Sequence, residues 1–515
     1  MFLKWVSWKI ELFTLFVGAT ILLILWLKRR TTYFQRMGIP TPPTTFLLGN
    51  MRDSISQKRS FGEETKWQYN YLKAKNKLHG GIYLFWNAVY FPIDPELIKH
   101  IMQNDFHHFV DRGVYVNEED DPLSAHLFSL KGKKWKNLRA KLTPTFTSGK
   151  MKMMFGVLLK CGKDFVDEID RIKHEPIDIK DMLARFTTDI IGSCAFGLEC
   201  NSMKEPNNEF REKGKKVFDA GIIDNLKGLL TFIMPEFAKS LGMRITNDEV
   251  TKFFMKVISD TVKYREKNNI YRKDFMHLLI QLKNKGKLVE DGNLSADKDD
   301  DGDVITFNEL AAQAFVFFIA GFETSSTTMT FCLFELASNP DIQKKLRQEV
   351  LDVLEKYNGE LTYDAIMDMH YMEKVVNETL RKYPPLPSLN RECTKDYRIP
   401  GTEVILKKGM KLIIPVIGLH HDEDYYPQPE KFDPERFSAE NLNRHPYTFL
   451  PFGEGPRICI GLRFGMMQTK VGLSVLLKNY EFTVSSKTRL PLVMDPRSFI
   501  LSTKGGIWLN CQKIE

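Results

Sequence analysis

The sequence lacks a cysteine framework. Its 515 residues contain seven cysteines, an odd number without regular spacing and without a CxxC pair. That pattern argues against a disulfide-stapled secreted domain and against a structural zinc site, and it favours a reducing compartment. The cysteines stand at positions 161, 194, 200, 332, 393, 459 and 511.

Linkers and internal repeats are also missing. After residue 50, no stretch rich in proline, glycine or serine divides the chain, whose composition is 43% hydrophobic and 27% charged. These values are those of a globular protein with a large core and exclude disordered and fibrous classes. The net charge of +8 is too sparse for a nucleic-acid binder of this size, but it suits a basic patch facing an acidic partner or a membrane. We predict one large domain and no nucleic-acid partner.

The longest apolar run lies near the N-terminus. Residues 12–27 are uncharged and mostly apolar, and Lys28, Arg29 and Arg30 follow directly. At about 1.5 Å per residue the run falls a little short of a ~30 Å hydrocarbon core, and apolar residues before it can extend it. A signal peptide is the alternative, but the run does not end in the small residues of a cleavage site. We expect residues 1–30 to be an uncleaved single-pass anchor whose flanking charges place the C-terminal side in the cytosol.

A proline-rich segment follows the anchor. The sequence "GIPTPPTTFLLGN" at 38–50 contains Pro40, Pro42 and Pro43, which stiffen the chain into an extended form. We expect residues 31–50 to be a rigid hinge that holds the globular domain, residues 51–515, off the membrane.

Helical periodicity dominates between residues 60 and 390. It predicts long helices at 150–172, 178–196, 208–222, 247–283, 306–337 and 340–356, and β-branched runs predict strands near 80–94 and 403–415. The expected fold is mainly α with a minor β region. The apolar stretch 226–237 fits a core segment or a second membrane contact equally well. Residues 297–309 begin like a calcium loop, but Asn308 replaces the required glutamate, so we expect an acidic surface linker.

One cysteine has unusual neighbours. Cys459 lies in "FLPFGEGPRICIG" at 449–461, where Gly453, Gly455 and Gly461 allow backbone conformations closed to other residues. A helical pattern follows, so the sulfur should lie near a helix N-terminus, where the dipole favours a thiolate. A cysteine protease needs a histidine partner and a zinc site needs three more ligands, and neither has a recognisable signature. A haem iron takes a single thiolate from the protein. We expect the other six cysteines to be packed apolar residues.

The loop around Cys459 resembles the cysteine-ligand loop of the cytochrome P450 haem-thiolate monooxygenases. Their pattern F-x-x-G-x-R-x-C-x-G is matched at Phe452, Gly455, Arg457, Cys459 and Gly461. Other family signatures follow in order across almost the whole chain. "PTFTSGKMK" at 144–152 and the general spacing resemble the animal microsomal branch, especially its insect members that metabolise xenobiotics. The resemblance implies haem b with Cys459 as the iron ligand, O2 as co-substrate and an endoplasmic reticulum membrane location.

Several distant residues are implied to hold the haem or its loop. "WKNLR" and the segments around 391 and 457 match propionate-binding positions, a task suited to the donors of arginine. The implied cofactor contacts are Trp135, Arg139, Arg391, Arg457, Phe452 and Ala320, with Arg112 of "FVDRG" as a looser match. "ETLR" and "DPERF" imply a buried structural network of Glu378, Arg381 and Arg436, although Glu378 and Arg381 alone would be an ordinary helix salt bridge.

The segment "FIAGFETSS" at 318–326 interrupts a long apolar helix. A glycine there costs roughly 1 kcal/mol, but the segment matches the family motif A-G-x-D/E-T at Ala320, Gly321, Glu323 and Thr324. The resemblance implies that Thr324, with Glu323 and ordered water, delivers protons to the distal oxygen while the thiolate promotes O–O cleavage. Ala320 and Thr324, four residues apart, would share the face toward the iron.

No dinucleotide motif accompanies these segments. Gly453 and Gly455 begin a GxG, but Ile458 stands where the last glycine of the fingerprint is needed. By resemblance, electrons come from NADPH through the membrane-bound NADPH-cytochrome reductase, with cytochrome b5 as a further candidate partner. Basic side chains around the Trp135 helix and after the haem loop could form the docking face. They are Lys133, Lys134, Lys136, Lys141, Arg463 and Lys470.

The positions implied to face substrate are apolar. They are Val316, Ile319, Ala320, Leu386, Ile500, Leu501 and, more weakly, Phe128. An apolar lining indicates a lipophilic small molecule, either a xenobiotic such as a plant toxin or insecticide or an endogenous lipid or hormone. Two other hypotheses stay open: a haem-thiolate isomerase or dehydratase that needs no reductase, and a non-catalytic haem-binding membrane protein. The Glu323–Thr324 pair argues against both.

Overall fold

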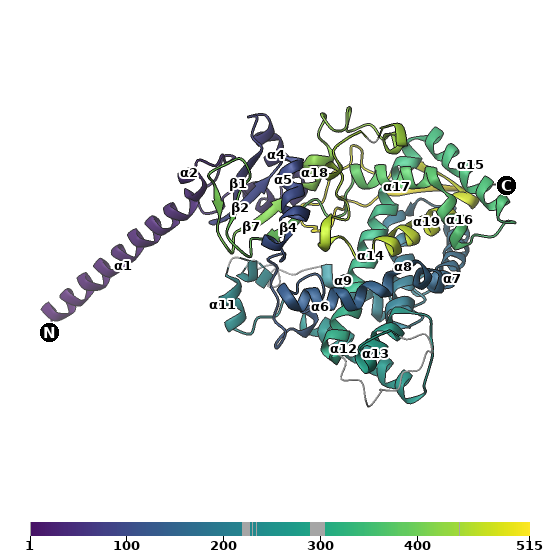
Figure 1. The fold of residues 1–515 in the computed structure, drawn as a ribbon, viewed down its shortest axis with the longest axis horizontal. Coiled ribbons are helices and arrows are strands. Elements are labelled where there is room, and N and C mark those ends of the chain that lie inside the picture. Colours follow the sequence, from purple (N-terminus) through teal and green to yellow (C-terminus); the bar gives the residue numbers. More distant parts are fainter. Residues whose placement is uncertain are drawn as a thin grey trace.

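A computed structural model describes residues 2–218, 227–228, 230–232, 234–288, 304–441 and 443–514. Figure 1 shows a helix-rich body, with a small sheet on the side from which the N-terminal helix projects. The acidic residues at 297–302 and the end of the expected helix 208–222 lie outside the described residues. The segment 226–237 is described only in part.

The body consists mainly of helices, which confirms the expected fold class. The longer helices are α1 (Phe2–Thr31), α4 (Phe61–Lys73), α6 (Gly132–Leu142), α7 (Ser148–Ile172), α8 (Ile179–Ile191), α9 (Glu209–Phe218), α12 (Asp248–Lys267), α13 (Phe275–Lys285), α14 (Phe307–Ser338), α15 (Pro340–Lys356), α17 (His370–Lys382) and α19 (Leu462–Asn479). The shorter ones are α2 (Tyr33–Arg36), α3 (Arg52–Ile55), α5 (Pro95–Lys99), α11 (Pro235–Ser240), α16 (Tyr363–Asp368) and α18 (Val416–His420).

The strands form small sheets at two edges of the body. β1 (His79–Leu84), β2 (Asn87–Pro92), β7 (Lys411–Ile414) and β4 (Leu389–Glu392) form a four-stranded sheet in that order. β2 and β7 are parallel, and the other two pairs are antiparallel, with Arg391 opposite Leu412. β3 (Ile177–Asp178), β9 (Trp508–Lys513) and β8 (Tyr480–Val484) form a second sheet, and β5 (Tyr397–Arg398) pairs with β6 (Ile405–Leu406). The first sheet thereby carries Arg391 into the interior.

Two expected elements are each divided in the structure. The helix expected over 247–283 is α12 and α13, because Asn268 and Asn269 end the first helix and Asp274 caps the second by accepting from the His277 N–H. Asn269 has a left-handed φ of 48°. The strand expected over 403–415 is β6 and β7, which join different sheets, because Gly409 turns the chain between them with a φ of 88°.

Helix α14 forms the centre of the core. Most of its side chains are buried, and α8, α19, α17, α12 and α13 pack around it. Both α14 and residues Glu11–Thr31 of α1 are long and apolar enough to span a membrane. Since α14 is covered by its neighbours, its apolar character is explained by the core. The apolar side chains of α1 are mostly exposed instead.

The segment 31–50 is docked on the first sheet. Phe34 is fully buried against Gly81, and its N–H donates to the Tyr83 hydroxyl at 2.9 Å. The Asn50 side chain donates to the carbonyl of Pro43 at 2.9 Å. The expected extended spacer is therefore a short, fixed connection, since Phe34 fits into space that a side chain at residue 81 would fill.

Candidate functional site

The Cys459 loop is held by its own backbone. The Cys459 N–H donates to the Phe452 carbonyl at 2.9 Å, and α19 begins three residues later. Gly453 and Gly455 have left-handed φ values of 71° and 70°, and a Cβ on Gly455 would collide with the Met102 carbonyl. Gly461 has a φ of −88°, which any residue adopts. Two of the three glycines are thus required by the backbone of the loop, and the expectation for Gly461 is wrong.

The Cys459 thiol does not ionise easily. Burial raises its pKa, although the Gly461 N–H and the charges of Arg112 and Arg139 act in the opposite direction. Without a bound metal, desolvation outweighs the nearby donors, so the start of α19 alone does not lower the pKa of this thiol. The surrounding protein desolvates the sulfur, but the residue itself is exposed. A thiol of raised pKa is a poor nucleophile at neutral pH but loses its proton when a metal ion takes its place.

Three arginines from other segments lie near this loop, and a fourth, Arg457, belongs to it; we call them the arginine cluster: Arg112, Arg139, Arg391 and Arg457. Arg391 and Arg457 are 1% and 2% exposed. Burial, followed by repulsion from neighbouring arginines, lowers the pKa of Arg391 well below its usual value and that of Arg457 to about 9. Burial also lowers the pKa of Arg112 to about 10. Asp111 lies 3.7 Å from Arg457 and offsets part of this charge.

The cluster has donors left over. In the part of the chain that the structure describes, Nε of Arg391 and Nε of Arg112 are buried without a hydrogen-bond partner. Unpaired buried donors on cations are costly, so a site of this kind is suited to an anionic group. Haem carries two propionates, and arginine binds carboxylates through paired donors. The residues present therefore fit a haem whose iron lies at Cys459.

Arg457 and Arg139 connect distant segments to the Cys459 loop. Arg457 donates to the carbonyls of Val110 at 2.9 Å and Leu130 at 2.8 Å, and its guanidinium lies 4.0 Å from the centre of the Trp135 ring. Arg139, one turn after Trp135 on α6, donates to the Ile458 carbonyl at 2.9 Å. The pairing of Trp135 and Arg139 expected from the sequence thus faces the loop.

The interrupted segment of α14 is the part of this helix that is accessible. Between Leu310 and Ala337 every residue is buried except those at 319–321 and 323–324, and Ala320 is exposed. The Thr324 hydroxyl donates to the Ala320 carbonyl at 2.6 Å. Gly321 lets α8 approach, since a Cβ there would lie 2.5 Å from Cδ1 of Ile191. Gln468 of α19 donates to the Gly321 carbonyl at 3.1 Å, which ties the motif to the helix after Cys459.

Glu323 has a partner that sequence reasoning missed. Lys180 of α8 pairs with Glu323 at 2.8 Å and also donates to the hydroxyls of Ser326 at 2.9 Å and Thr327 at 2.8 Å. The lysine lies 143 residues before the glutamate. No local pattern marks it, because a lysine near the start of an amphipathic helix is ordinary.

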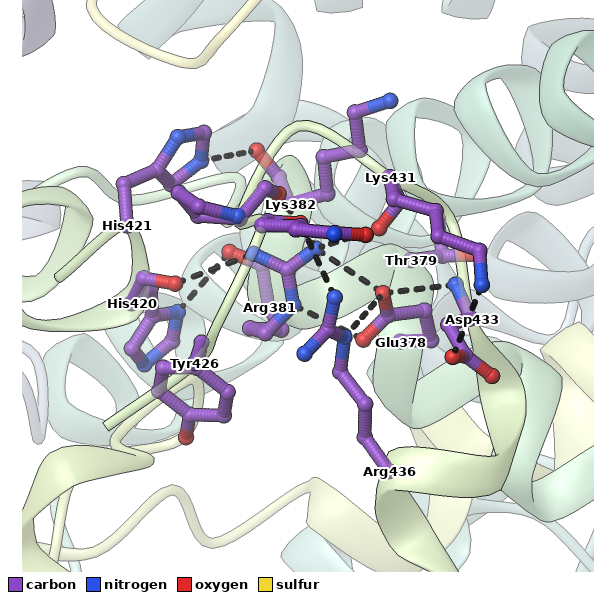
Figure 2. Close-up of polar contacts among 12 residues, drawn as sticks. Glu378, Thr379, Arg381, Lys382, His420, His421, Tyr426, Lys431, Asp433 and Arg436 are labelled. Atoms are coloured by element: carbon purple, nitrogen blue, oxygen red, sulfur yellow. Dashed lines mark hydrogen bonds and ion pairs between the residues drawn. The ribbon is translucent and has the colours of Figure 1, made fainter. Parts of the chain in front are cut away.

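Glu378, Arg381 and Arg436 meet in one buried network (Figure 2). Arg381 donates to Glu378 through Nε at 2.7 Å and Nη2 at 2.8 Å, and Nε of Arg436 lies 3.3 Å from the same carboxylate. The Asp433 N–H donates to Glu378 at 2.9 Å. Both Glu378 and Arg381 are fully buried. The network thus joins α17 to the segment that carries "PERF".

His420 continues this network to the Cys459 loop and was not predicted. The Leu450 N–H donates to its Nε2 at 2.9 Å, so Nδ1 carries the proton and donates to the Arg381 carbonyl at 3.1 Å. The ring stacks on Phe449, with centres 5.3 Å apart. Burial, together with the charges of His421 and Arg381, lowers the His420 pKa to about 3. A neutral histidine therefore fixes the segment that leads into "FLPFGEG".

The residues expected to face substrate differ in burial. Val316, Ile500 and Leu501 are buried, whereas Phe128, Ile319 and Leu386 are partly accessible. The Leu501 N–H donates to the Pro385 carbonyl at 3.0 Å, which places the C-terminal segment beside Leu386. The Phe128 ring lies 4.2 Å from the Arg112 guanidinium. Apolar side chains from three distant segments thus accompany the arginine cluster and α14.

A helical body, a lone accessible cysteine before a long helix and a cluster of buried arginines together define a haem-thiolate protein. Comparison with known proteins agrees. Residues 40–510 match the family model described as cytochrome P450. In Drosophila melanogaster, probable cytochrome P450 6a14 is 45% identical over 94% of this chain and 96% of its own length, and cytochrome P450 6a2 is 43% identical over 97% and 99%.

The chain belongs to the cytochrome P450 family and is of the insect type. It is a monooxygenase, an oxidoreductase that uses O2 and a haem iron bound by a cysteine thiolate.

Proposed function

We propose that this protein is a membrane-anchored monooxygenase that inserts one oxygen atom of O2 into lipophilic small molecules. The surplus of buried positive charge in the arginine cluster beside Cys459 is the observation that carries the proposal. The haem iron, bound by Cys459, supplies the oxygen-activating chemistry, and the protein positions the substrate and controls water and protons.

The chain's own residues divide the remaining tasks. Arg391 and Arg112 have unused donors that would bind the propionates. Arg139 holds the Cys459 loop by donating to the Ile458 carbonyl, and Arg457 ties the loop to α6 through its contact with the Trp135 ring. Phe452, in the Cys459 loop, and Ala320, on the accessible turn of α14, would contact the macrocycle.

Protons would pass along the accessible turn of α14. Thr324 Oγ1 holds a proton that it donates to the Ala320 carbonyl, and this hydroxyl can turn toward a reacting oxygen instead. Glu323 is a carboxylate within the same turn, and Lys180 holds it in place. The pair can relay protons through ordered water.

The substrate class follows from the apolar residues near α14. Val316, Ile319, Leu386 and Leu501 are apolar, and so is Phe128, whose ring lies beside Arg112. Such a lining favours a lipophilic compound. We propose xenobiotics such as plant toxins or insecticides as the main class, with endogenous lipids or hormones as the other.

Electrons would come from NADPH through the membrane-bound reductase, with cytochrome b5 as a further candidate partner, at the cytosolic face of the endoplasmic reticulum. Lys133, Lys136 and Arg463 are exposed and could form the docking face. Lys470 cannot belong to it, because it is 3% exposed and its ammonium bonds to Glu373 at 3.1 Å. Rising salt should slow reductase-supported turnover, and turnover independent of salt would exclude this face.

The absorption spectrum of the reduced, carbon monoxide-bound protein tests the iron site. We expect a strongly red-shifted Soret band that Cys459→Ser abolishes. Oxygen consumption with NADPH and reductase, in the presence of a lipophilic substrate, tests the reaction. Turnover of a hydroperoxide without reductase or O2 would instead identify an isomerase or dehydratase.

A further inference from the structure

A groove of about 570 Å³ lies where the anchor helix meets the body. It is lined by the end of α1, by α2, by the start of β2 and by the turn between β6 and β7, with Phe232 and Pro235 on one side. Figure 1 shows α2 and the first sheet at the end of α1, and α11, which Pro235 begins, on the same side of the body. The groove is far from Cys459 in the chain and shares no lining residue with the arginine cluster.

The groove is strongly cationic. Among the described residues, six basic side chains and no acidic one line it: Arg29, Arg30, Arg36, Lys407, Lys408 and Lys411. Lys407 pairs with Asp396 at 2.8 Å, outside the lining. Within the described ranges, neither the Arg29 guanidinium nor the Lys408 ammonium pairs with an acidic side chain. Like charges held this close repel one another, and an anion in the groove would relieve the repulsion.

Aromatic rings stand beside these cations. The Arg30 guanidinium lies 5.0 Å from the centre of the Trp26 ring, and the Lys411 ammonium lies 4.3 Å from that of Phe232. Tyr33 completes the lining. Tryptophan and tyrosine are typical of the membrane–water interface, where one end of the ring is apolar and the other is wet. The groove can thus take an anionic head and the apolar beginning of a chain.

The anchor fixes the depth of the groove in a bilayer. The apolar run 12–27 ends one residue after Trp26, and the groove begins at Trp26 and continues through Arg36. A span that places this run in the hydrocarbon core places the groove among the headgroups. The segment 31–50 is docked on the first sheet, so the groove cannot move far from this level.

We propose that this groove binds the headgroup of an anionic phospholipid, with its phosphate and carboxylate among Arg29, Lys408 and the other basic residues. Anionic lipid is concentrated at this depth, and each lysine or arginine near such a surface adds to the attraction. The proposal rests on the proposed membrane anchoring. Residues at 232 and 235 would then lie at the membrane surface, which favours the membrane-contact interpretation of 226–237.

Native mass spectrometry of the full-length holoprotein in detergent tests the proposal. With phosphatidylserine and phosphatidylcholine added in equal amounts, we expect one phosphatidylserine to be retained about tenfold more than phosphatidylcholine. Replacing the two unpaired cations together, Arg29→Gln with Lys408→Gln, should bring the ratio close to one. Arg29→Lys with Lys408→Arg keeps the charge and should keep the preference.

Matched controls remove equal charge elsewhere. Lys252→Gln with Lys344→Gln changes exposed lysines on α12 and α15, away from the groove, and should leave the lipid ratio unchanged. The reduced carbon monoxide spectrum confirms that each variant is folded. Carbonate extraction of vesicles that contain the protein tests anchoring separately, because an extracted protein contradicts the anchor whatever the lipid ratio.

Three results would overturn the groove's assignment. The first is an equal retention of the two lipids by the wild type. The second is displacement of phosphatidylserine by millimolar inorganic phosphate at constant ionic strength, which would identify a site for a free anion. The third is a glutamine variant that keeps its lipid preference but loses affinity for the reductase, which would identify a docking surface for an acidic protein.

Discussion

The neutral histidine between α17 and the Cys459 loop should make the protein sensitive to acid. His420 has a pKa of about 3 in the folded chain, against an ordinary value of 6.5. Because the pKa of His420 is lower in the folded chain than in the unfolded chain, the stabilisation that the neutral ring provides is complete above pH 6.5 and is lost as pH falls below that value. At pH 5.5 the unfolded chain binds a proton at this site in about nine molecules of ten and the folded chain in almost none. Linkage then lowers the free energy of unfolding by about 1.4 kcal/mol, compared with less than about 0.1 kcal/mol at pH 7.5.

Glutamine at 420 isolates this effect, because it offers a donor and an acceptor and does not titrate. We expect His420→Gln to cost about 1 kcal/mol at pH 7.5, where its bonds are less well aligned. Between pH 7.5 and 5.5 it should lose about 1.4 kcal/mol less than the wild type, since all other titrating groups are shared. His420→Phe keeps the stacking on Phe449 but leaves the Leu450 N–H and the Arg381 carbonyl buried without partners, and it should cost about 2–4 kcal/mol.

Guanidinium unfolding of the solubilised holoenzyme at the two pH values measures both quantities. Equal losses for wild type and His420→Gln over this interval would refute the neutral, doubly bonded histidine. So would a His420→Phe variant as stable as the wild type, because the two backbone groups would then have other partners.

Three further substitutions test the site. Arg391→Gln should speed haem transfer to apomyoglobin by about 10–100-fold, because it removes a charge-assisted hydrogen bond to the haem. It should not destabilise the apoprotein, since neighbouring arginines repel this charge there. Slower transfer would contradict the assignment of Arg391 to a propionate. Lys180→Met should release Glu323 and cost about 2 kcal/mol of stability. It should also raise the peroxide formed per NADPH consumed several-fold, and an unchanged ratio would show that Lys180 has no part in the proton path. Gly455→Ala should abolish the red-shifted carbon monoxide band through collision with Met102, whereas Gly461→Ala, with its nearest neighbour at 3.9 Å, should keep it.

Local sequence patterns predicted the elements whose ends are set by residues close to them in the chain. The helix expected over 306–337 is α14, since Thr306 caps it together with Glu309. The helix expected over 340–356 is α15, which starts at a proline. The Cys459 loop was recognisable because its glycines, arginine and cysteine lie within thirteen residues.

Contacts between distant segments were not predictable in the same way. Lys180 and His420 are ordinary residues in their own helices, and they gain a role only when folding brings Glu323 and Leu450 to them. Lys470 was expected in the docking face because it follows the haem loop, and the fold buries it. The prolines of residues 31–50 are visible in the sequence, but the docking of this segment depends on how Phe34 fits against Gly81, 47 positions further along the chain.

Two groups of buried arginines in this chain show how a structural site differs from a binding site. Arg381 and Arg436 share the carboxylate of Glu378, and the carbonyls of His420 and Pro429 accept the remaining donors of Arg381. In the arginine cluster Asp111 lies near Arg457 alone. Among the described residues, the buried Nε atoms of Arg391 and Arg112 have neither a hydrogen-bond partner nor an ion pair with a carboxylate.

A buried arginine loses its hydration in both places, so the two groups differ in the carboxylates and hydrogen-bond acceptors that the chain supplies to replace water. In the Glu378 network the chain supplies the carboxylate: Nε of Arg436 makes no aligned hydrogen bond, but it lies 3.3 Å from Glu378. Replacing members of this network should therefore harm folding whether or not haem is present. The arginine cluster is incomplete without an anion, and replacing Arg391 should harm haem retention alone. Both groups consist of arginines, so residue type does not distinguish them. The difference is whether the chain supplies an anion for the buried positive charge: it does so in the network that supports the loop, and it does not in the cluster that holds the cofactor.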